Sequence, residues 1–106
     1  MTERSRLVKL LPCIACEIER VSQLQPTEAH HLNIGGKAGQ KRMGDIYQIP
    51  LCTWHHRGDP PQGVTAGEMA YSHGPSMARD SKMFRFTYGL DERLWELTNA
   101  KVQQIT

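Results

Sequence analysis

Two short pairs of metal-binding residues constrain this chain more than any other feature of its sequence. Cys13 and Cys16 are separated by two residues, and so are Cys52 and His55. A two-residue spacer lets both side chains of a turn reach one ion, and three thiolates with one imidazole are a common ligand set of structural Zn²⁺. The pattern therefore predicts two turns that close around one tetrahedral zinc.

The chain is so short that a bound ion is expected to stabilise its fold. With 106 residues, of which 39% are apolar, the sequence fits one small domain whose core alone gives marginal stability. Structural zinc contributes about 10–16 kcal/mol of apparent binding free energy in small zinc domains. The three cysteines cannot all pair as disulfides, and we find no export signal, so reduced, metal-bound or catalytic thiols are expected. The alternative is three buried, inert cysteines and a surface histidine.

Charge and hydropathy narrow the function classes only a little. A formal net charge of +2 is too small to identify a partner. No apolar stretch approaches the roughly 20 residues that cross a bilayer, and the first residues do not resemble a signal peptide. We expect a cytoplasmic protein with no membrane contact.

The residue pattern predicts an α+β fold. We expect a basic lead-in over residues 1–12 and one zinc-stapled domain over residues 13–106. Two strands are expected at residues 26–32 and 45–51, because β-forming residues gather there. The segment between them carries four glycines and three basic residues, which predicts a surface loop.

Helices are expected mainly after the second strand. A short helix should start at Cys52 and end at His56, and residues 59–74 are interpreted as a long connecting loop. Two C-terminal helices should follow, from Pro75 to Tyr88 and from Asp91 to Ile105, with Gly74 and Asp91 as their N-caps. Both should pack on a small metal-centred core.

Four of the five histidines form two adjacent pairs, one at the end of the first predicted strand and one shortly after the second. These are His30-His31 and His55-His56. If His55 completes the zinc site, His56 lies about 100° further round its helix and must point elsewhere, toward the other pair. That geometry predicts a second site where imidazoles hold a metal and accept a proton. The reverse assignment of His55 and His56 stays open, as does the reading that the histidines are only exposed polar residues or extra zinc ligands.

The cysteine pair, the histidine pairs and the glycine-rich loop occur along the chain in the order found in one known family. The chain resembles HNH, or His-Me finger, endonucleases that carry a structural zinc. The resemblance implies a ββα-metal core and covers residues 13–97. More narrowly, the chain is similar to phage recombination-enhancement nucleases of the Ref type, which are RecA-dependent. The strings that carry this similarity are His30-His31-Leu32, Gly35-Gly36-Lys37, Ile49-Pro50-Leu51-Cys52, His55-His56-Arg57-Gly58, His73-Gly74 and residues 82–89.

The resemblance implies a role for each cleft histidine. His31 matches the general base that takes a proton from water, while His30 and His56 match ligands of a catalytic divalent ion, Mg²⁺ or Zn²⁺. An imidazole titrates near neutral pH and can accept the proton, while the cation stabilises charge on the phosphate. His73 stands where the narrower group also has a histidine, which implies a third ligand or a phosphate contact; a plain surface residue is an equal alternative.

One residue of the HNH pattern has no match in this chain. The middle Asn of that pattern, which helps to orient the base, is absent, and Tyr47 or Gln48 occupies its neighbourhood. The interaction that orients His31 is therefore left open by the sequence.

Basic residues near the cleft are the candidates for DNA contacts, because Lys and Arg neutralise phosphates without reading sequence. The candidates are Lys37, Lys41 and Arg42 in the glycine-rich loop and Arg57 beside the cleft. A further basic group in the penultimate helix, made of Arg79, Lys82 and Arg85, is better interpreted as a solvated charged face.

The expected function is a metal-dependent DNA endonuclease of phage or prophage type. Its substrate would be DNA bound by a RecA-type recombinase filament. One alternative is a non-catalytic zinc module that binds nucleic acid or a protein partner. Another is a thiol redox protein that uses Cys13 and Cys16.

Overall fold

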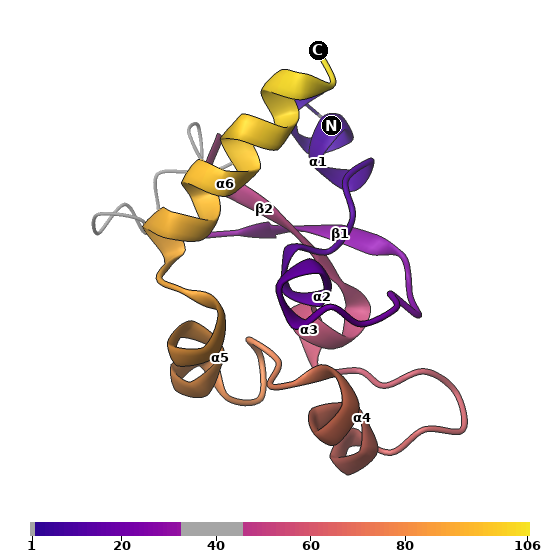
Figure 1. Ribbon diagram of the computed structural model, residues 1–106. Helices are drawn as coiled ribbons and strands as arrows, with labels where there is room; N and C mark the ends of the chain where they lie inside the picture. Colours follow the sequence, from indigo (N-terminus) through magenta and orange to yellow (C-terminus); the bar gives the residue numbers. More distant parts are fainter. Residues whose placement is uncertain (1, 33–45) are drawn as a thin grey trace.

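A computed structural model describes residues 2–32 and 46–106 of the chain, which form helices around a two-stranded sheet (Figure 1). The elements of the described residues are α1 (Glu3–Lys9), α2 (Ile14–Glu19), β1 (Thr27–His31), β2 (Gln48–Cys52), α3 (Thr53–Arg57), α4 (Ala66–His73), α5 (Ser81–Tyr88) and α6 (Asp91–Gln104). The mixed α+β composition agrees with the expectation from the sequence.

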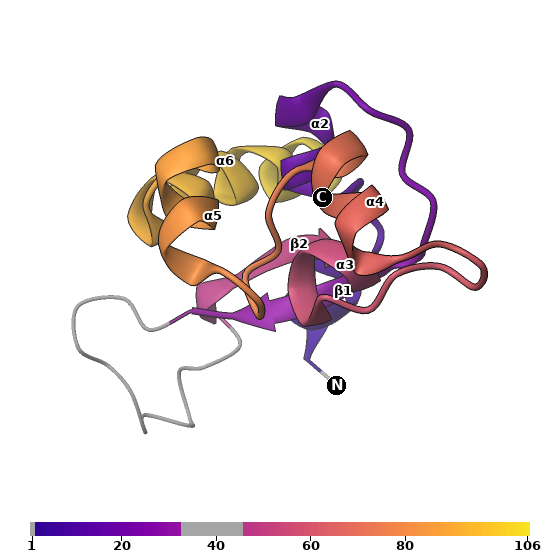
Figure 2. The ribbon, with the colours of Figure 1, turned by 90° about the horizontal axis from the view of Figure 1, so that it is seen from below.

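The two strands are antiparallel, and α3 follows β2 directly. Their register pairs Thr27 with Cys52 at one end and His31 with Gln48 at the other. All residues of β2 are buried, whereas β1 is only partly buried. Figure 2 shows the cause: α2, α4, α5 and α6 gather on one side of the sheet. Both predicted strands therefore exist, with β2 beginning later than expected.

The N-terminal segment contributes to the core. Thr2 caps α1 by accepting a hydrogen bond from the backbone N–H of Ser5 at 3.1 Å, and α1 contacts both strands. Val8 is fully buried, and the Arg4 guanidinium donates to the Gln48 carbonyl at 3.0 Å. The expected lead-in thus contains a helix that packs against the sheet.

The second half of the chain differs from the expectation in three respects. The predicted loop contains α4, which begins with a capping box between Thr65 and Glu68. The next helix begins at Ser81 instead of Pro75, because the backbone N–H of Met77 bonds to the His55 carbonyl at 2.8 Å. The last helix begins at Asp91, whose carboxylate binds Arg85 instead of capping the helix.

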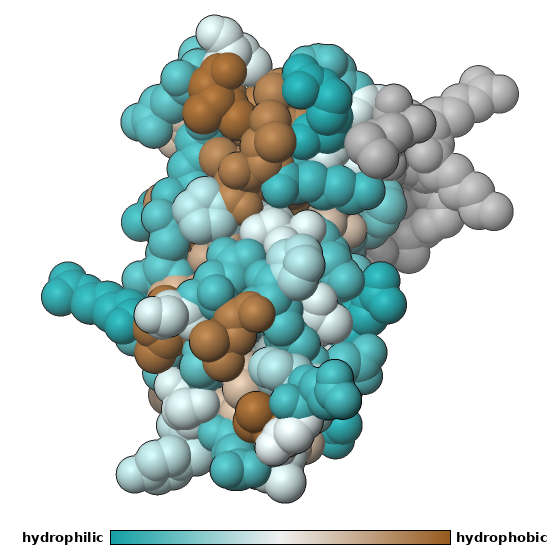
Figure 3. Space-filling model, turned by 90° about the vertical axis from the view of Figure 1, so that its right-hand side faces the viewer, coloured by the Kyte–Doolittle hydropathy of each residue, from teal (hydrophilic) through white to brown (hydrophobic). Residues whose placement is uncertain are grey.

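The core combines residues from nearly every element. Its fully buried side chains include Ile14, Ile49, Trp54, Phe84 and Leu94. On the face seen in Figure 3, hydrophobic side chains form separate patches among hydrophilic ones. Within residues 2–32 and 46–106, none of the helices combines the length and the apolar character needed to span a bilayer.

Candidate metal centre and histidine cluster

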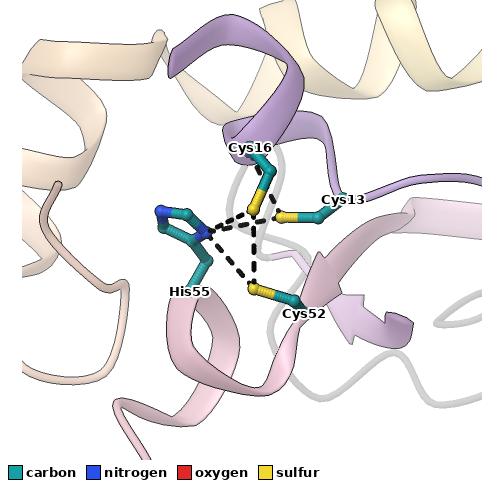
Figure 4. A group of neighbouring side chains, drawn as sticks. All are labelled: Cys13, Cys16, Cys52 and His55. Carbon is teal, nitrogen blue, oxygen red and sulfur yellow. Dashed lines mark hydrogen bonds between the residues drawn. The ribbon is translucent and has the colours of Figure 1, made fainter. Parts of the chain in front are cut away.

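Three cysteines and one histidine converge from three elements (Figure 4). Cys13 is the N-cap of α2 and Cys16 lies in its first turn, while Cys52 ends β2 and His55 lies in α3. The Nδ1 atom of His55 is 3.4 Å from the Sγ atoms of Cys13 and Cys52 and 3.6 Å from that of Cys16. All four residues are buried. The structure thus places His55, and not His56, with the thiols.

These separations can be compared with the edges of a tetrahedral zinc site. Zn–S bonds of about 2.3 Å and a Zn–N bond of about 2.05 Å give S···S edges of about 3.8 Å and S···N edges of about 3.6 Å. The Sγ atoms of Cys16 and Cys52 are 3.8 Å apart, and the S···N separations are 3.4–3.6 Å. The Cys₃His cluster therefore fits structural zinc.

The end of α4 orients His55 so that its Nδ1 atom faces the thiols. The Nε2–H of His55 donates to the backbone carbonyl of His73 at 2.7 Å, which leaves the lone pair of Nδ1 for the metal. The Tyr88 hydroxyl donates to the same carbonyl at 2.9 Å. Trp54 Nε1 donates to the next carbonyl, that of Gly74, at 3.0 Å. These donors tie α3 and α5 to the end of α4 beside the metal centre.

Electrostatics inside the cluster also favour a cation. Hydrogen bonding with Cys13 raises the pKa of the Cys16 thiol and lowers that of the Cys52 thiol. Burial alone would lower the pKa of His55, but the sulfurs of Cys13 and Cys52 outweigh burial and raise this pKa to about 10. The buried sulfurs thus stabilise positive charge, and a divalent cation supplies it while leaving the imidazole neutral.

His56 points away from this cluster, toward β1. Its Nδ1 atom lies 2.7 Å from the Glu28 Oε1 atom, and its ring centroid is 4.9 Å from that of His30. Burial, followed by the charge that the His56 ring carries when it is protonated, lowers the pKa of His30 to about 4. The His30 imidazole is therefore neutral at neutral pH, which is the form that binds metals. The adjacent residues His55 and His56 take part in two different groups.

His31 contacts the neighbouring strand. It is the exposed last residue of β1, and its Nε2 atom is 3.1 Å from the Nε2 atom of Gln48, its partner in the register. Of the two residues that the sequence offered in place of the missing Asn, Gln48 is thus the one that hydrogen-bonds the ring. The ring of Tyr47 instead packs against that of Trp95, with 5.2 Å between the ring centroids.

His73 is not brought into the group of His30 and His56. Its ring is buried, with Nε2 donating to the Ser22 carbonyl at 2.9 Å and Nδ1 accepting from the Ser72 hydroxyl at 2.7 Å. Both ring nitrogens are therefore used by neighbouring residues, and neither offers a lone pair to a second ion. The contribution of His73 to the metal centre is its backbone carbonyl beside His55.

The basic candidates are distributed unevenly. Arg57 is exposed and donates from Nε to Glu28 Oε1 at 3.0 Å. Arg79 donates to the Gly58 carbonyl, and Arg85 pairs with Asp91, so neither is a freely solvated charge. Three further candidates, Lys37, Lys41 and Arg42, lie outside the described residues.

Sequence reasoning missed Glu28, which contacts His56. A signal was present, because residues two apart in a strand face the same side, and Glu28 precedes His30 by two. Without the placement of α3 over this face, the carboxylate could not be linked to His56.

Comparison with known proteins gives a family and no individual relative. No curated protein and no solved structure matches the chain. A family model described as recombination enhancement, RecA-dependent nuclease matches residues 2–103, which is nearly the whole sequence. The chain therefore belongs to the family of recombination enhancement, RecA-dependent nucleases.

Proposed function

We propose that this chain is a metal-dependent DNA endonuclease of the HNH type that acts on DNA bound by a RecA-type filament. Its family supports a nuclease role linked to RecA. The order of β1, β2 and α3 supports the HNH assignment, because it carries one histidine pair at the end of β1 and the other on α3.

The proposal rests chiefly on the divergence of two neighbouring imidazoles. His55 is buried against the thiols, whereas the ring centroids of His56 and His30 are 4.9 Å apart. One residue thus completes a structural centre while the next begins a second group beside it. The second group would hold a divalent ion, Mg²⁺ or Zn²⁺, through His30 and His56. When bound, this ion supplies positive charge that stabilises the phosphate during cleavage.

His31 is assigned the role of general base. It is exposed at the end of β1, where a water molecule and a DNA phosphate can approach it. Its hydrogen bond with Gln48 limits the rotation of the ring and so takes the place of the missing Asn. For His31 to act as the base, the Gln48 amide presents its oxygen to Nε2–H, which leaves the Nδ1 lone pair to take the proton. A neutral imidazole carries one nitrogen lone pair, and this lone pair is what takes the proton from water.

Contacts with DNA are assigned to basic residues that follow each histidine pair in the sequence. Arg57 lies next to His56 in sequence, and its guanidinium is exposed. Three further basic residues belong to the segment that follows His30-His31 and joins the two strands, namely Lys37, Lys41 and Arg42. Lys and Arg at these places would neutralise phosphates without selecting a base sequence.

A nicking assay tests this function. Supercoiled DNA and DNA paired with RecA-coated single strands should each be incubated with the protein and Mg²⁺ or Mn²⁺. We expect cleavage of at least the filament-bound substrate, and a rate about 10²–10⁴-fold lower for His31→Ala, because a general base typically contributes that factor. The control is Tyr71→Ala, which changes a side chain that is 94% exposed on α4 and should leave the rate unchanged.

Two results would contradict the proposal. Equal cleavage by His31→Ala and the unaltered protein would remove the assigned base. Absence of cleavage on both substrates, with nucleic-acid binding that His30→Ala and His56→Ala leave intact, would favour a non-catalytic zinc module.

A further inference from the structure

We propose that Glu28 is a positioning residue that fixes the tautomer and orientation of His56 for binding the second ion. This inference rests on the proposed function, because that function makes His56 a ligand of the ion. Three observations carry it: the place of Glu28 on the sheet, the donors around its carboxylate, and the nitrogen that His56 leaves available.

The strand places Glu28 and His30 on one face. The two residues are two positions apart in β1, opposite Leu51 and Ile49 of β2. Side chains two apart in a strand point to the same side. Because α3 follows β2 without a connecting loop, the helix returns over this face and brings His56 to both side chains.

The Glu28 carboxylate is held in place by several donors. Its Oε1 atom accepts from His56 Nδ1 at 2.7 Å and from Arg57 Nε at 3.0 Å. Its Oε2 atom accepts from the Thr53 hydroxyl at 3.3 Å. All three donors lie on α3, so the carboxylate also fixes the helix against β1. The guanidinium of Arg57 compensates the negative charge in this partly buried place.

The contact with Glu28 decides which nitrogen of His56 can bind a metal. A carboxylate accepts hydrogen bonds, so the proton of the neutral ring stays on Nδ1 and the lone pair stays on Nε2. His55 shows the opposite arrangement, with Nε2–H bound to a carbonyl and Nδ1 turned to the thiols. A metal-binding histidine usually donates its other N–H to such an acceptor, which raises its basicity. The two neighbouring rings thus use different nitrogens for their two sites.

The test measures the tautomer and the affinity separately, in protein that retains its structural zinc. Nitrogen-15 NMR of the His56 ring, recorded without a second ion, should show the Nδ1–H form in the unaltered protein. Glu28→Ala should shift the ring toward the Nε2–H form and weaken Mn²⁺ binding, followed by electron paramagnetic resonance, by about 10–100-fold. The His56→Ala variant defines which bound Mn²⁺ belongs to this site.

Two further variants separate positioning from other roles. Glu28→Gln keeps an oxygen acceptor for Nδ1–H, so it should retain the tautomer and most of the Mn²⁺ affinity. If Glu28 were itself a ligand, Glu28→Gln would lose as much affinity as Glu28→Ala. The control is Glu17→Ala, which removes a carboxylate that pairs with Lys101 at 2.6 Å and should change neither measurement.

The possible failures are distinguishable. An Nε2–H tautomer in the unaltered protein, or unchanged Mn²⁺ affinity in Glu28→Ala, would overturn the role of Glu28 while leaving the nuclease proposal standing. If the unaltered protein bound no Mn²⁺ that depends on His56, the proposed second ion would fail, and the role of Glu28 toward it would fail with it.

Discussion

Gly74 shows how one residue supports the metal centre through its neighbours. Its φ of 86° and ψ of −178° lie in a region that side-chain-bearing residues rarely adopt. A Cβ atom at this position would overlap the Tyr88 hydroxyl, which donates to the His73 carbonyl next to His55. The absence of a side chain thus lets α4 end directly beside the ring that faces the thiols.

We predict that Gly74→Ala destabilises the protein much more than Gly63→Ala does. Both positions have positive φ, but a Cβ atom at Gly63 meets nothing within 4 Å. Backbone strain should cost about 1–2 kcal/mol at Gly63. Gly74→Ala should add about 1–3 kcal/mol for the overlap with Tyr88. Urea unfolding of the two zinc-loaded variants measures the difference, and equal losses of stability would show that Tyr88 moves aside without cost.

At the scale of elements, two helix starts differ in their capping. Thr65 accepts from the Glu68 backbone N–H at 3.1 Å, and the Glu68 carboxylate accepts from the Thr65 N–H at 2.9 Å. Leu90 has a suitable N-cap backbone for α6, with φ −70° and ψ 160°, but its side chain has no acceptor. A side-chain N-cap therefore stabilises the start of α4, whereas the start of α6 has none.

This contrast predicts that substitutions at the two N-caps change the free energy of unfolding in opposite directions. Thr65→Ala should lower the free energy of unfolding by about 1 kcal/mol, because it leaves a first-turn N–H without its acceptor. Leu90→Ser should raise the free energy of unfolding by up to about 1 kcal/mol, since Leu90 is 64% exposed and little packing is lost. Thermal melts of the two variants give the signs, and a stabilised Thr65→Ala would contradict this account of α4.

The elements that could be predicted are those whose signals are local. The zinc residues share a two-residue spacing, and the strands carry β-forming residues bounded by turns, so both follow from short stretches of sequence. The capping box of α4 is also local, yet the glycines and prolines around residues 59–74 concealed it. The start of α5 is not local, because Met77 gives its N–H to the carbonyl of His55, which is far away in sequence.

The candidate site divides in the same way. Spacing alone identified the thiols and favoured His55 over His56 as their partner. The contact between His56 and Glu28 depends on how α3 lies over β1, which no short motif encodes. His73 accepts the hydrogen bond of His55 through its backbone carbonyl, while its ring contacts Ser22 and Ser72. This arrangement depends likewise on the packing of α4.

At the scale of the whole molecule, the Cys₃His cluster is the junction of the fold. Its residues come from the start of α2, the end of β2 and α3, and the end of α4 supports one of them. These links matter because the sheet of the described residues has two strands, and a two-stranded sheet is marginal by itself. Loss of the ion would therefore separate elements that the short helices cannot hold together.

We predict that one tightly bound zinc per chain is required for folding. Structural zinc supplies about 10–16 kcal/mol of apparent binding free energy, which is comparable to the whole stability of about 5–15 kcal/mol of an ordinary domain. A strong chelator or Cys16→Ser should therefore abolish the cooperative melt seen by circular dichroism, together with the bound zinc measured by a colorimetric assay. His56→Ala is the matched control: its ring lies outside the cluster, so it should keep one zinc and the melt. A folded, zinc-free Cys16→Ser protein would show that packing alone holds these elements together.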